Sequence, residues 1–283
     1  MGQQIHWFPG HMNKALNEIE NKVKLVDVII ELLDARAPLS SINENLEKAI
    51  QNKKRLIVLT KIDLADTNAT KEWVDFLKQK HDNVLTLDLK NNGADAILSK
   101  AVIALGKDKW EKEMAKGMKP QPIRAMIIGI PNVGKSSLIN RLAKRKAAGV
   151  QNKPGYTRGE QWIKVNKDFL LLDTPGILPM SYENQKKAAN LALIGAIRED
   201  ILPNETLSEL LLDYLKVQYP TALNERFGIG SITDRLTVLN QIAEKRKLVN
   251  NVGQNDLVRA ESLLLKEFKD GLLGKITLEK YVA

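Results

Sequence analysis

Residues 129–136 read GIPNVGKS and fit the phosphate-loop pattern G-x-x-x-x-G-K-[ST]. In such a loop, glycines let backbone amides converge on phosphate oxygens, and the amides that open the next helix add to that field. We expect the Lys135 ammonium to reach the β- and γ-phosphates of a nucleotide and the Ser136 hydroxyl to ligate Mg²⁺. The other expected loop contacts are Asn132, Val133, Gly134 and Ser137. A chance match is the alternative, but an apolar run precedes the loop and a helical pattern follows it.

A second motif, DTPG, spans residues 173–176 and follows an apolar run at 169–172. A carboxylate at the end of a strand beside a phosphate loop is well placed to hold Mg²⁺ through a water molecule, which predicts that role for Asp173. The amide of Gly176 is then expected to contact the γ-phosphate. By itself the tetrapeptide fits a type I turn, so its interpretation depends on the phosphate loop.

Thr157 lies between these two motifs, in the sequence PGYTR at 154–158. A loop with one hydroxyl group can close over Mg²⁺ when the γ-phosphate is present, which makes Thr157 a candidate metal ligand. Threonine beside glycine and proline is often only a turn residue. Its position between the two phosphate motifs favours the metal role.

The tetrapeptide TKID at 60–63 follows another apolar run. The Asp63 carboxylate can accept hydrogen bonds from N1–H and the exocyclic amine of guanine, a pattern that adenine does not offer. Adenine would leave the carboxylate unpaired, so such a site rejects it. We expect Thr60 to belong to the same contact and Lys61 to lie along the face of the base. A strand-to-helix cap is the alternative for so short a motif.

Six apolar segments predict strands, and they lie at 26–35, 55–60, 84–87, 123–128, 161–165 and 169–172. Helical periodicity separates them, at 13–24, 43–51, 70–80, 94–114 and 135–143. This alternation predicts a doubly wound α/β domain with a mostly parallel sheet. The charged segment 107–122 is expected to be a connector.

Beyond Pro179 only helical patterns remain, at 184–198, 206–219, 232–245 and 256–268. A small all-helical domain is therefore expected after the α/β domain. We place the two domains at 1–178 and 179–283.

The 283 residues have the composition of a globular protein, with 43% hydrophobic and 27% charged side chains. The absence of cysteine excludes disulfides, iron–sulfur clusters and thiolate metal sites. No apolar run approaches the roughly 18 residues of a transmembrane helix, and the first 24 residues lack the apolar block of a signal peptide. We expect a cytoplasmic protein that does not enter a membrane.

The net charge of +9 is unevenly distributed. Residues 178–283 hold 14 basic and 14 acidic side chains, so the whole excess lies in residues 1–177. The stretch 141–164 contains seven basic residues and one acidic residue, Glu160. This stretch suits a polyanion such as RNA, and a solvated helix face is the alternative.

Together, GIPNVGKS, DTPG and TKID resemble the motif set of the P-loop GTPases. We call TKID the base motif, because Asp63 is expected to read the guanine base. Most GTPases place this motif last, whereas here Asp63 precedes Lys135, and this order resembles the circularly permuted GTPases. WFPGHM at 7–12 and DARAP at 34–38 narrow the resemblance to the YlqF-type family of ribosome biogenesis GTPase A. The resemblance covers essentially the whole chain.

The resemblance implies a monomeric GTPase that binds GTP, GDP and Mg²⁺ and assists assembly of the bacterial large (50S) ribosomal subunit. The expected partners are the precursor of that subunit, its rRNA and ribosomal proteins, with release after hydrolysis. The helical domain is expected to contact RNA or the ribosome.

Two positions of this chain depart from the family pattern. Thr60 replaces the usual Asn, which predicts a slightly looser loop. The expected SAK-like guanine loop reads Asp88-Leu89-Lys90, which weakens the base contact expected of Asp88 and Leu89.

Hydrolysis needs a group that orients water, and Ile177, which follows the DTPG glycine, carries none. Slow intrinsic turnover, stimulated by ribosomal particles, is therefore expected. The resemblance implies that His11 of WFPGHM acts with Lys135 in catalysis, because imidazole can orient or deprotonate water. A helix cap or an RNA contact is the alternative for His11.

The resemblance also implies that Asn132 helps bind K⁺ beside the β- and γ-phosphates, where a cation balances transition-state charge. Otherwise Asn132 only tolerates the backbone angles of the loop.

Two other classes of function stay open. One is an RNA-binding protein that uses GTP only for structure, which turnover stimulated by large-subunit particles would exclude. The other is a P-loop ATPase or kinase, and Asp63 argues against it by favouring GDP over ADP.

Overall fold

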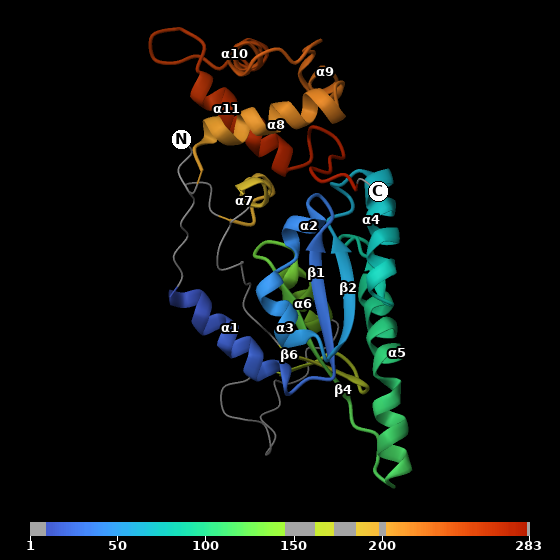
Figure 1. The fold of residues 1–283 in the computed structure, drawn as a ribbon. Coiled ribbons are helices and arrows are strands. Elements are labelled where there is room, and N and C mark those ends of the chain that lie inside the picture. The colour runs from blue at the N-terminus through green and yellow to red at the C-terminus, as the bar shows by residue number, and fades with distance from the viewer. Residues whose placement is uncertain (1–9, 145–161, 173–184, 198–201, 282–283) are drawn as a thin grey trace.

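The computed structural model describes residues 10–144, 162–172, 185–197 and 202–281 (Figure 1). Its six strands form one sheet in the order β3-β2-β1-β4-β6-β5. They are β1 (Val28–Asp34), β2 (Lys54–Thr60), β3 (Val84–Thr86), β4 (Ile123–Gly129), β5 (Trp162–Lys164) and β6 (Phe169–Leu172). Of these described strands, β5 alone runs antiparallel to its neighbour. The expected doubly wound, mostly parallel sheet is confirmed.

Strands β1 and β4 flank the point at which the chain changes direction across the sheet. From β1 the chain continues to β2 and β3 on one side, and from β4 it continues to β5 and β6 on the other. Ligands of open α/β sheets bind at this point, beyond the carboxyl ends of the strands. DARAP begins at the end of β1, TKID at the end of β2 and the phosphate loop at the end of β4, so the three motifs share this edge.

Helices cover both faces of the sheet because the central strands are apolar on both sides. In β1, Val28, Ile30 and Leu32 pack under α5 and α6, whereas Ile29 and Leu33 pack under α1, α3 and α4. The helices of this part are α1 (Gly10–Val23), α2 (Pro38–Ser41), α3 (Glu44–Ile50), α4 (Thr67–Lys80), α5 (Ala94–Ala115) and α6 (Lys135–Lys144).

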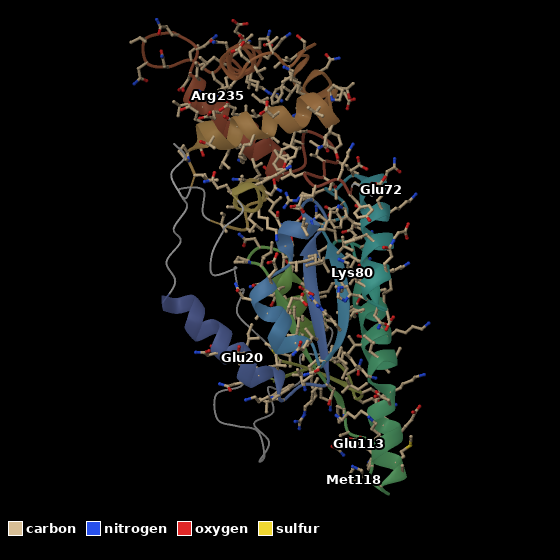
Figure 2. All side chains as sticks on the ribbon, viewed as in Figure 1. Glu20, Glu72, Lys80, Glu113, Met118 and Arg235 are labelled. Atoms are coloured by element: carbon tan, nitrogen blue, oxygen red, sulfur yellow. The ribbon has the colours of Figure 1, made fainter. Side chains whose placement is uncertain are left out.

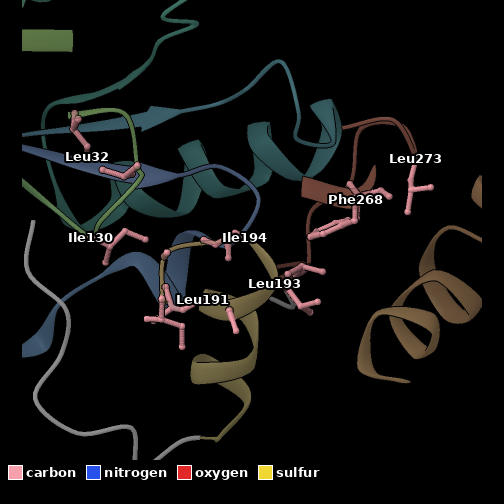
Figure 3. Close-up of a cluster of buried hydrophobic side chains, with 14 of the residues drawn as sticks. Leu32, Ile130, Leu191, Leu193, Ile194, Phe268 and Leu273 are labelled. Carbon is pink, nitrogen blue, oxygen red and sulfur yellow. The ribbon is translucent and has the colours of Figure 1, made fainter. Parts of the chain in front are cut away.

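The rest of the chain forms a helical region beside the carboxyl ends of the strands, with α7 between the sheet and the outer helices (Figure 1). Its helices are α7 (Gln185–Leu193), α8 (Asn204–Gln218), α9 (Ala222–Phe227), α10 (Arg235–Arg246) and α11 (Leu257–Lys269). Their apolar side chains continue the core cluster of the sheet without a break. Figure 3 shows this contact, where Ile130 lies near Leu191 and Ile194.

After α11 the chain returns to the loops of the sheet. The amide of Ile276 donates to the carbonyl of Leu64 at 3.1 Å, and the amide of Leu278 donates to the carbonyl of Arg36 at 2.7 Å. The boundary expected between 178 and 179 lies outside the described residues.

Two expectations about the elements were wrong, and two short helices were not expected. The segment 107–122 is not a connector throughout, because α5 runs to Ala115. The helix expected at 184–198 ends at Leu193, close to Gly195 with its left-handed φ of 76°. Helices α2 and α9 were not expected, since they are too short to show a helical period.

Candidate nucleotide-binding site

The phosphate loop joins β4 to α6 through several residues of unusual backbone conformation. Gly129, Asn132 and Gly134 have φ angles of 153°, 57° and 108°. Such conformations turn amides toward one side and form a concave nest for an anion. A Cβ at position 134 would lie 2.8 Å from Leu89 Cδ1, the end of a flexible side chain that would have to shift. The φ of 108° is the stronger reason for glycine there, because side chains strain such a backbone.

Lys135 and the two serines after it form the first turn of α6. Lys135 is only 8% exposed, and its ammonium donates to the carbonyl of Gly129 at 3.1 Å. This hydrogen bond holds the ammonium back over the loop. Ser136 and Ser137 are exposed, as amides and hydroxyls that meet a phosphate and its metal must be.

Thr60 connects the base motif to the phosphate loop. Its side chain is fully buried at the end of β2, and its hydroxyl lies 2.6 Å from the carbonyl of Val133 and 3.2 Å from that of Leu33. The single hydroxyl proton serves one of these carbonyls at a time. Thr60 therefore contacts the phosphate loop, and the slightly looser loop expected from its replacement of Asn stays a prediction.

Lys61 and Asp63 follow at the same edge. Lys61 has a left-handed φ of 55°, and its ammonium lies 3.2 Å from the Asp34 carboxylate. The Asp63 carboxylate is 22% exposed and pairs with the Lys90 ammonium at 2.6 Å. This hydrogen bond raises the pKa of Lys90. Asp63 therefore accepts a donor from the solvent side, as recognition of guanine would require.

The segment 88–90 lies between the two motifs. Leu89 is the neighbour of Gly134 noted above, whereas Asp88 accepts the amide of Lys90 at 2.8 Å within its own turn. Arg141 of α6 donates to the carbonyl of Leu89 at 2.6 Å and so fixes the segment. From its sequence position Arg141 is expected only in the basic stretch, because its contact with Leu89 joins residues 52 positions apart.

Asp34 is the counter-ion beneath Lys61. Burial alone would raise the pKa of Asp34, but the Arg36 guanidinium and the Lys61 ammonium hold it below its ordinary value. Burial lowers the pKa of Lys61, and the Asp34 carboxylate opposes that shift. Asp34 is thus ionised at neutral pH, and its negative charge stabilises the protonated form of Lys61.

Asn132 connects the phosphate loop to the helical region. Its amide nitrogen donates to the carbonyl of Gly195, just after α7, at 2.7 Å. Sequence analysis considered Asn132 only as a loop residue or a K⁺ ligand. A contact with a segment 63 residues away leaves no local pattern by which it could be found.

Some expected site residues cannot be placed. His11 lies in α1, but its side chain is outside the description, and Thr157, Asp173 and Gly176 lie outside the described residues. Among the residues that are described, no three His, Asp or Glu side chains group as a metal site. Within the same part of the chain, no helix is long and apolar enough to span a membrane.

Comparison with known proteins identifies the family. The family model described as "50S ribosome-binding GTPase" matches residues 124–224, which include the phosphate loop and DTPG but not TKID. Ribosome biogenesis GTPase A of Bacillus cereus is 42% identical over 276 residues, which cover 97% of this chain and 93% of that protein. The chain belongs to the ribosome biogenesis GTPase A family.

More distant members support the same assignment. Ribosome biogenesis GTPase A of Thermotoga maritima is 30% identical over 277 residues, covering 98% of this chain and 94% of that protein. The mouse mitochondrial ribosome-associated GTPase 1 is 34% identical over 296 residues, covering 97% of this chain and 90% of that protein.

Two solved structures of YlqF from T. maritima share the fold. The GDP-bound structure has a TM-score of 0.69 and the GNP-bound structure 0.68, each at 26% identity. They cover 93% and 94% of this chain, and 98% of each solved chain is matched. As a member of the ribosome biogenesis GTPase A family, this chain is a GTPase of ribosome biogenesis, which excludes the ATPase or kinase interpretation.

Proposed function

We propose that this GTPase binds the precursor of the bacterial large ribosomal subunit in one nucleotide state and leaves it after hydrolysis. The observation that carries the proposal is the meeting of three loops at one edge of the sheet. Thr60 joins the base motif to the phosphate loop, and Asn132 joins that loop to the turn after α7. A nucleotide there would act on loops that already contact the helical region.

The guanine nucleotide is assigned to this edge. The Asp63 carboxylate would accept the N–H groups of guanine while Lys61 lies along the base, and Lys135 with the loop amides would hold the phosphates. The full proposed contact set is Thr60, Lys61, Asp63, Asp88, Leu89, Asn132, Val133, Gly134, Lys135, Ser136, Ser137, Thr157 and Gly176.

Mg²⁺ is assigned to Ser136, Thr157 and, through water, Asp173. Ser136 fits this role because its hydroxyl is exposed in the first turn of α6, next to Lys135. When bound, Mg²⁺ neutralises charge on the β- and γ-phosphates. Lys135 adds a second positive charge from the protein.

For hydrolysis we assign His11 to orient or deprotonate the attacking water, because Ile177 carries no group that does so. Asn132 is the proposed K⁺ residue. Its amide nitrogen is committed to Gly195, so its amide oxygen would be the ligand.

The proposed partners are rRNA and ribosomal proteins, which a cytoplasmic monomer would contact through the helical domain at 179–283 and the basic stretch at 141–164. Within that stretch Arg141 instead contacts Leu89, and its guanidinium lies 3.8 Å from Asp95. The RNA contact is therefore expected from the other basic residues, among which Lys164 is exposed.

An Asp63→Asn variant tests the guanine site. We expect preference to move from GTP toward xanthosine triphosphate, because the new amide offers a donor where xanthine carries O2. Nucleotide competition measures this preference, with Asp75→Asn as the matched control, because Asp75 is an exposed aspartate of α4 outside the proposed contact set. A variant with unchanged base preference would show that TKID does not contact the base.

Sedimentation with large-subunit precursors tests the cellular role. Binding should differ between GDP and a non-hydrolysable GTP analogue, and equal binding would refute a nucleotide-controlled release. With His11→Ala, particle-stimulated single-turnover hydrolysis should fall about 100-fold while GTP affinity stays the same. Wild-type stimulated turnover would exclude His11 from catalysis.

A further inference from the structure

Asp34 and Arg36 belong to DARAP, a motif with no part in the nucleotide contacts proposed above. The Arg36 guanidinium makes a bidentate pair with the Asp34 carboxylate: Nε donates to Oδ1 at 3.0 Å and Nη2 donates to Oδ2 at 2.8 Å. The Arg36 side chain is 2% exposed and that of Asp34 is 1% exposed. Because each buried charge would lose its counter-ion if the other moved, the two side chains are locked together.

The same carboxylate holds Lys61 of the base motif. The Lys61 ammonium lies 3.2 Å from Oδ2 of Asp34, the oxygen that also accepts from Arg36. Lys61 has a left-handed backbone directly after β2, and the Asp34 carboxylate fixes the position of its ammonium. Any movement of Asp34 would therefore be passed to Lys61.

The other hydrogen bonds of the Arg36 guanidinium reach the ends of two distant helices. Its Nη1 donates at 3.3 Å to the carbonyl of Lys269, the last residue of α11, and its Nη2 donates at 3.1 Å to the carbonyl of Ile194, just after α7. Carbonyls at helix ends lack partners within the helix and lie at the negative end of its dipole. Arg36 thus caps both helices. Figure 3 shows Ile194 and Phe268 at this junction.

Two further hydrogen bonds join the same segments, one between backbone groups and one from a side chain to a carbonyl. The carbonyl of Arg36 accepts the amide of Leu278, and the Asn132 side chain donates to the carbonyl of Gly195, each at 2.7 Å. The end of α7 is therefore held by the DARAP and phosphate loops together. The tail after α11 is held by the DARAP loop and, through Ile276, by the loop that carries Asp63.

The geometry points to a coupling role for Asp34 and Arg36: they are positioning residues that link guanine-nucleotide binding to the docking of α7 and α11 on the sheet. If these helices undock, Arg36 keeps a charge but loses two acceptors, and its movement disturbs Asp34 and then Lys61. Because linkage is reciprocal, a nucleotide held by Lys61 tightens the docking by the same factor. The inference rests on the proposed guanine site at Lys61 and Asp63.

Hydrogen exchange of the wild-type chain gives a first test that needs no variant. Saturation with GDP should slow exchange of the amides at 276–281 by about fivefold or more, the lower end of typical coupling factors. These amides belong to the tail, and none of them is in the proposed contact set. Unchanged exchange there, with GDP bound, would overturn the coupling.

Arg36→Lys tests the residue itself, because lysine keeps the charge but not the fork that reaches Asp34 and both helix ends. Arg55→Lys is the matched control. Arg55 is an 11% exposed arginine near the opposite end of β2 that pairs with Glu31 and Glu47. The Kd for GDP should rise at least about fivefold in Arg36→Lys and stay near wild type in Arg55→Lys. GDP-dependent protection of 276–281 should disappear only in Arg36→Lys.

Two outcomes of the variant experiment would overturn the inference. One is wild-type GDP affinity and protection in Arg36→Lys, and the other is the same losses in Arg55→Lys, which would indicate general destabilisation. Asp63→Asn separates the two proposals. Unchanged base preference in that variant would remove the guanine site and the coupling with it, whereas altered preference without tail protection by GDP would remove the coupling alone.

Discussion

Two arginines that each bridge distant segments show how differently the two regions of this GTPase use the same ion-pair chemistry. Arg36, at the carboxyl edge of the sheet, is 2% exposed and pairs with Asp34, which is 1% exposed. Arg235, the first residue of α10, is 19% exposed and pairs with Glu205, which is 67% exposed, and with Glu261, which is 12% exposed. Figure 2 places Arg235 at the end of the molecule opposite Glu113 of α5.

The two networks differ in whether water can solvate a charge that has lost its partner. Exposed partners are solvated whether or not they pair, so a surface pair contributes little to stability. Buried partners have no such access to water, so removal of Arg36 leaves Asp34, among the described residues, with only the Lys61 ammonium as a counter-ion, at 3.2 Å. The network at Arg36 joins loops assigned to the nucleotide, whereas the network at Arg235 joins α8, α10 and α11 without reaching those loops. Burial and position together predict which network matters for function.

The largest expected effect is that of Arg36→Met, which keeps much of the side-chain volume and removes the charge. We expect the nucleotide-free chain to lose about 3–5 kcal/mol in its free energy of unfolding, because Asp34 stays buried without its main partner. Urea denaturation followed by circular dichroism measures the loss. If the variant unfolds at the wild-type urea concentration, the buried pair of Arg36 contributes no more to stability than an exposed pair does.

Thr60→Val should have an intermediate effect at the same edge. The change keeps the shape of the side chain but removes the hydroxyl that reaches the carbonyls of Val133 and Leu33, which should cost about 1–3 kcal/mol. GDP affinity should fall as well, since the base motif loses its link to the phosphate loop. Thr60→Ser, which keeps the hydroxyl, is the control for urea denaturation and GDP titration. Equal behaviour of the valine and serine variants would mean that the hydrogen bond has no role.

Features set by local sequence could be predicted. Strand ends fell within about two residues of expectation because apolar runs bounded by polar residues define buried strands. The phosphate loop was found because its glycines and Lys135 are adjacent in the chain. DARAP, TKID and the phosphate loop share one edge because parallel strands present their carboxyl ends together.

Contacts between distant segments could not be predicted. The helix caps made by Arg36, the bond of Arg141 to Leu89 and that of Asn132 to Gly195 join residues 50 or more apart. Nothing in the neighbouring sequence encodes such a partner, since the tertiary fold alone brings the groups together.

Glu205→Gln should have the smallest effect and so completes the comparison. The variant removes the charge of an exposed partner of Arg235 while Glu261 still pairs with that arginine at 2.6 Å. We expect a loss of about 0.2–1 kcal/mol in the free energy of unfolding, and a smaller loss at high salt because salt screens exposed charges. GDP affinity should not change, since the network does not touch the proposed site. Urea denaturation at low and high salt, with GDP titration in parallel, checks all three. A loss as large as that of Arg36→Met would show that the helical region depends on its charges as strongly as the sheet edge does, and the contrast between buried and exposed pairs would not hold for this protein.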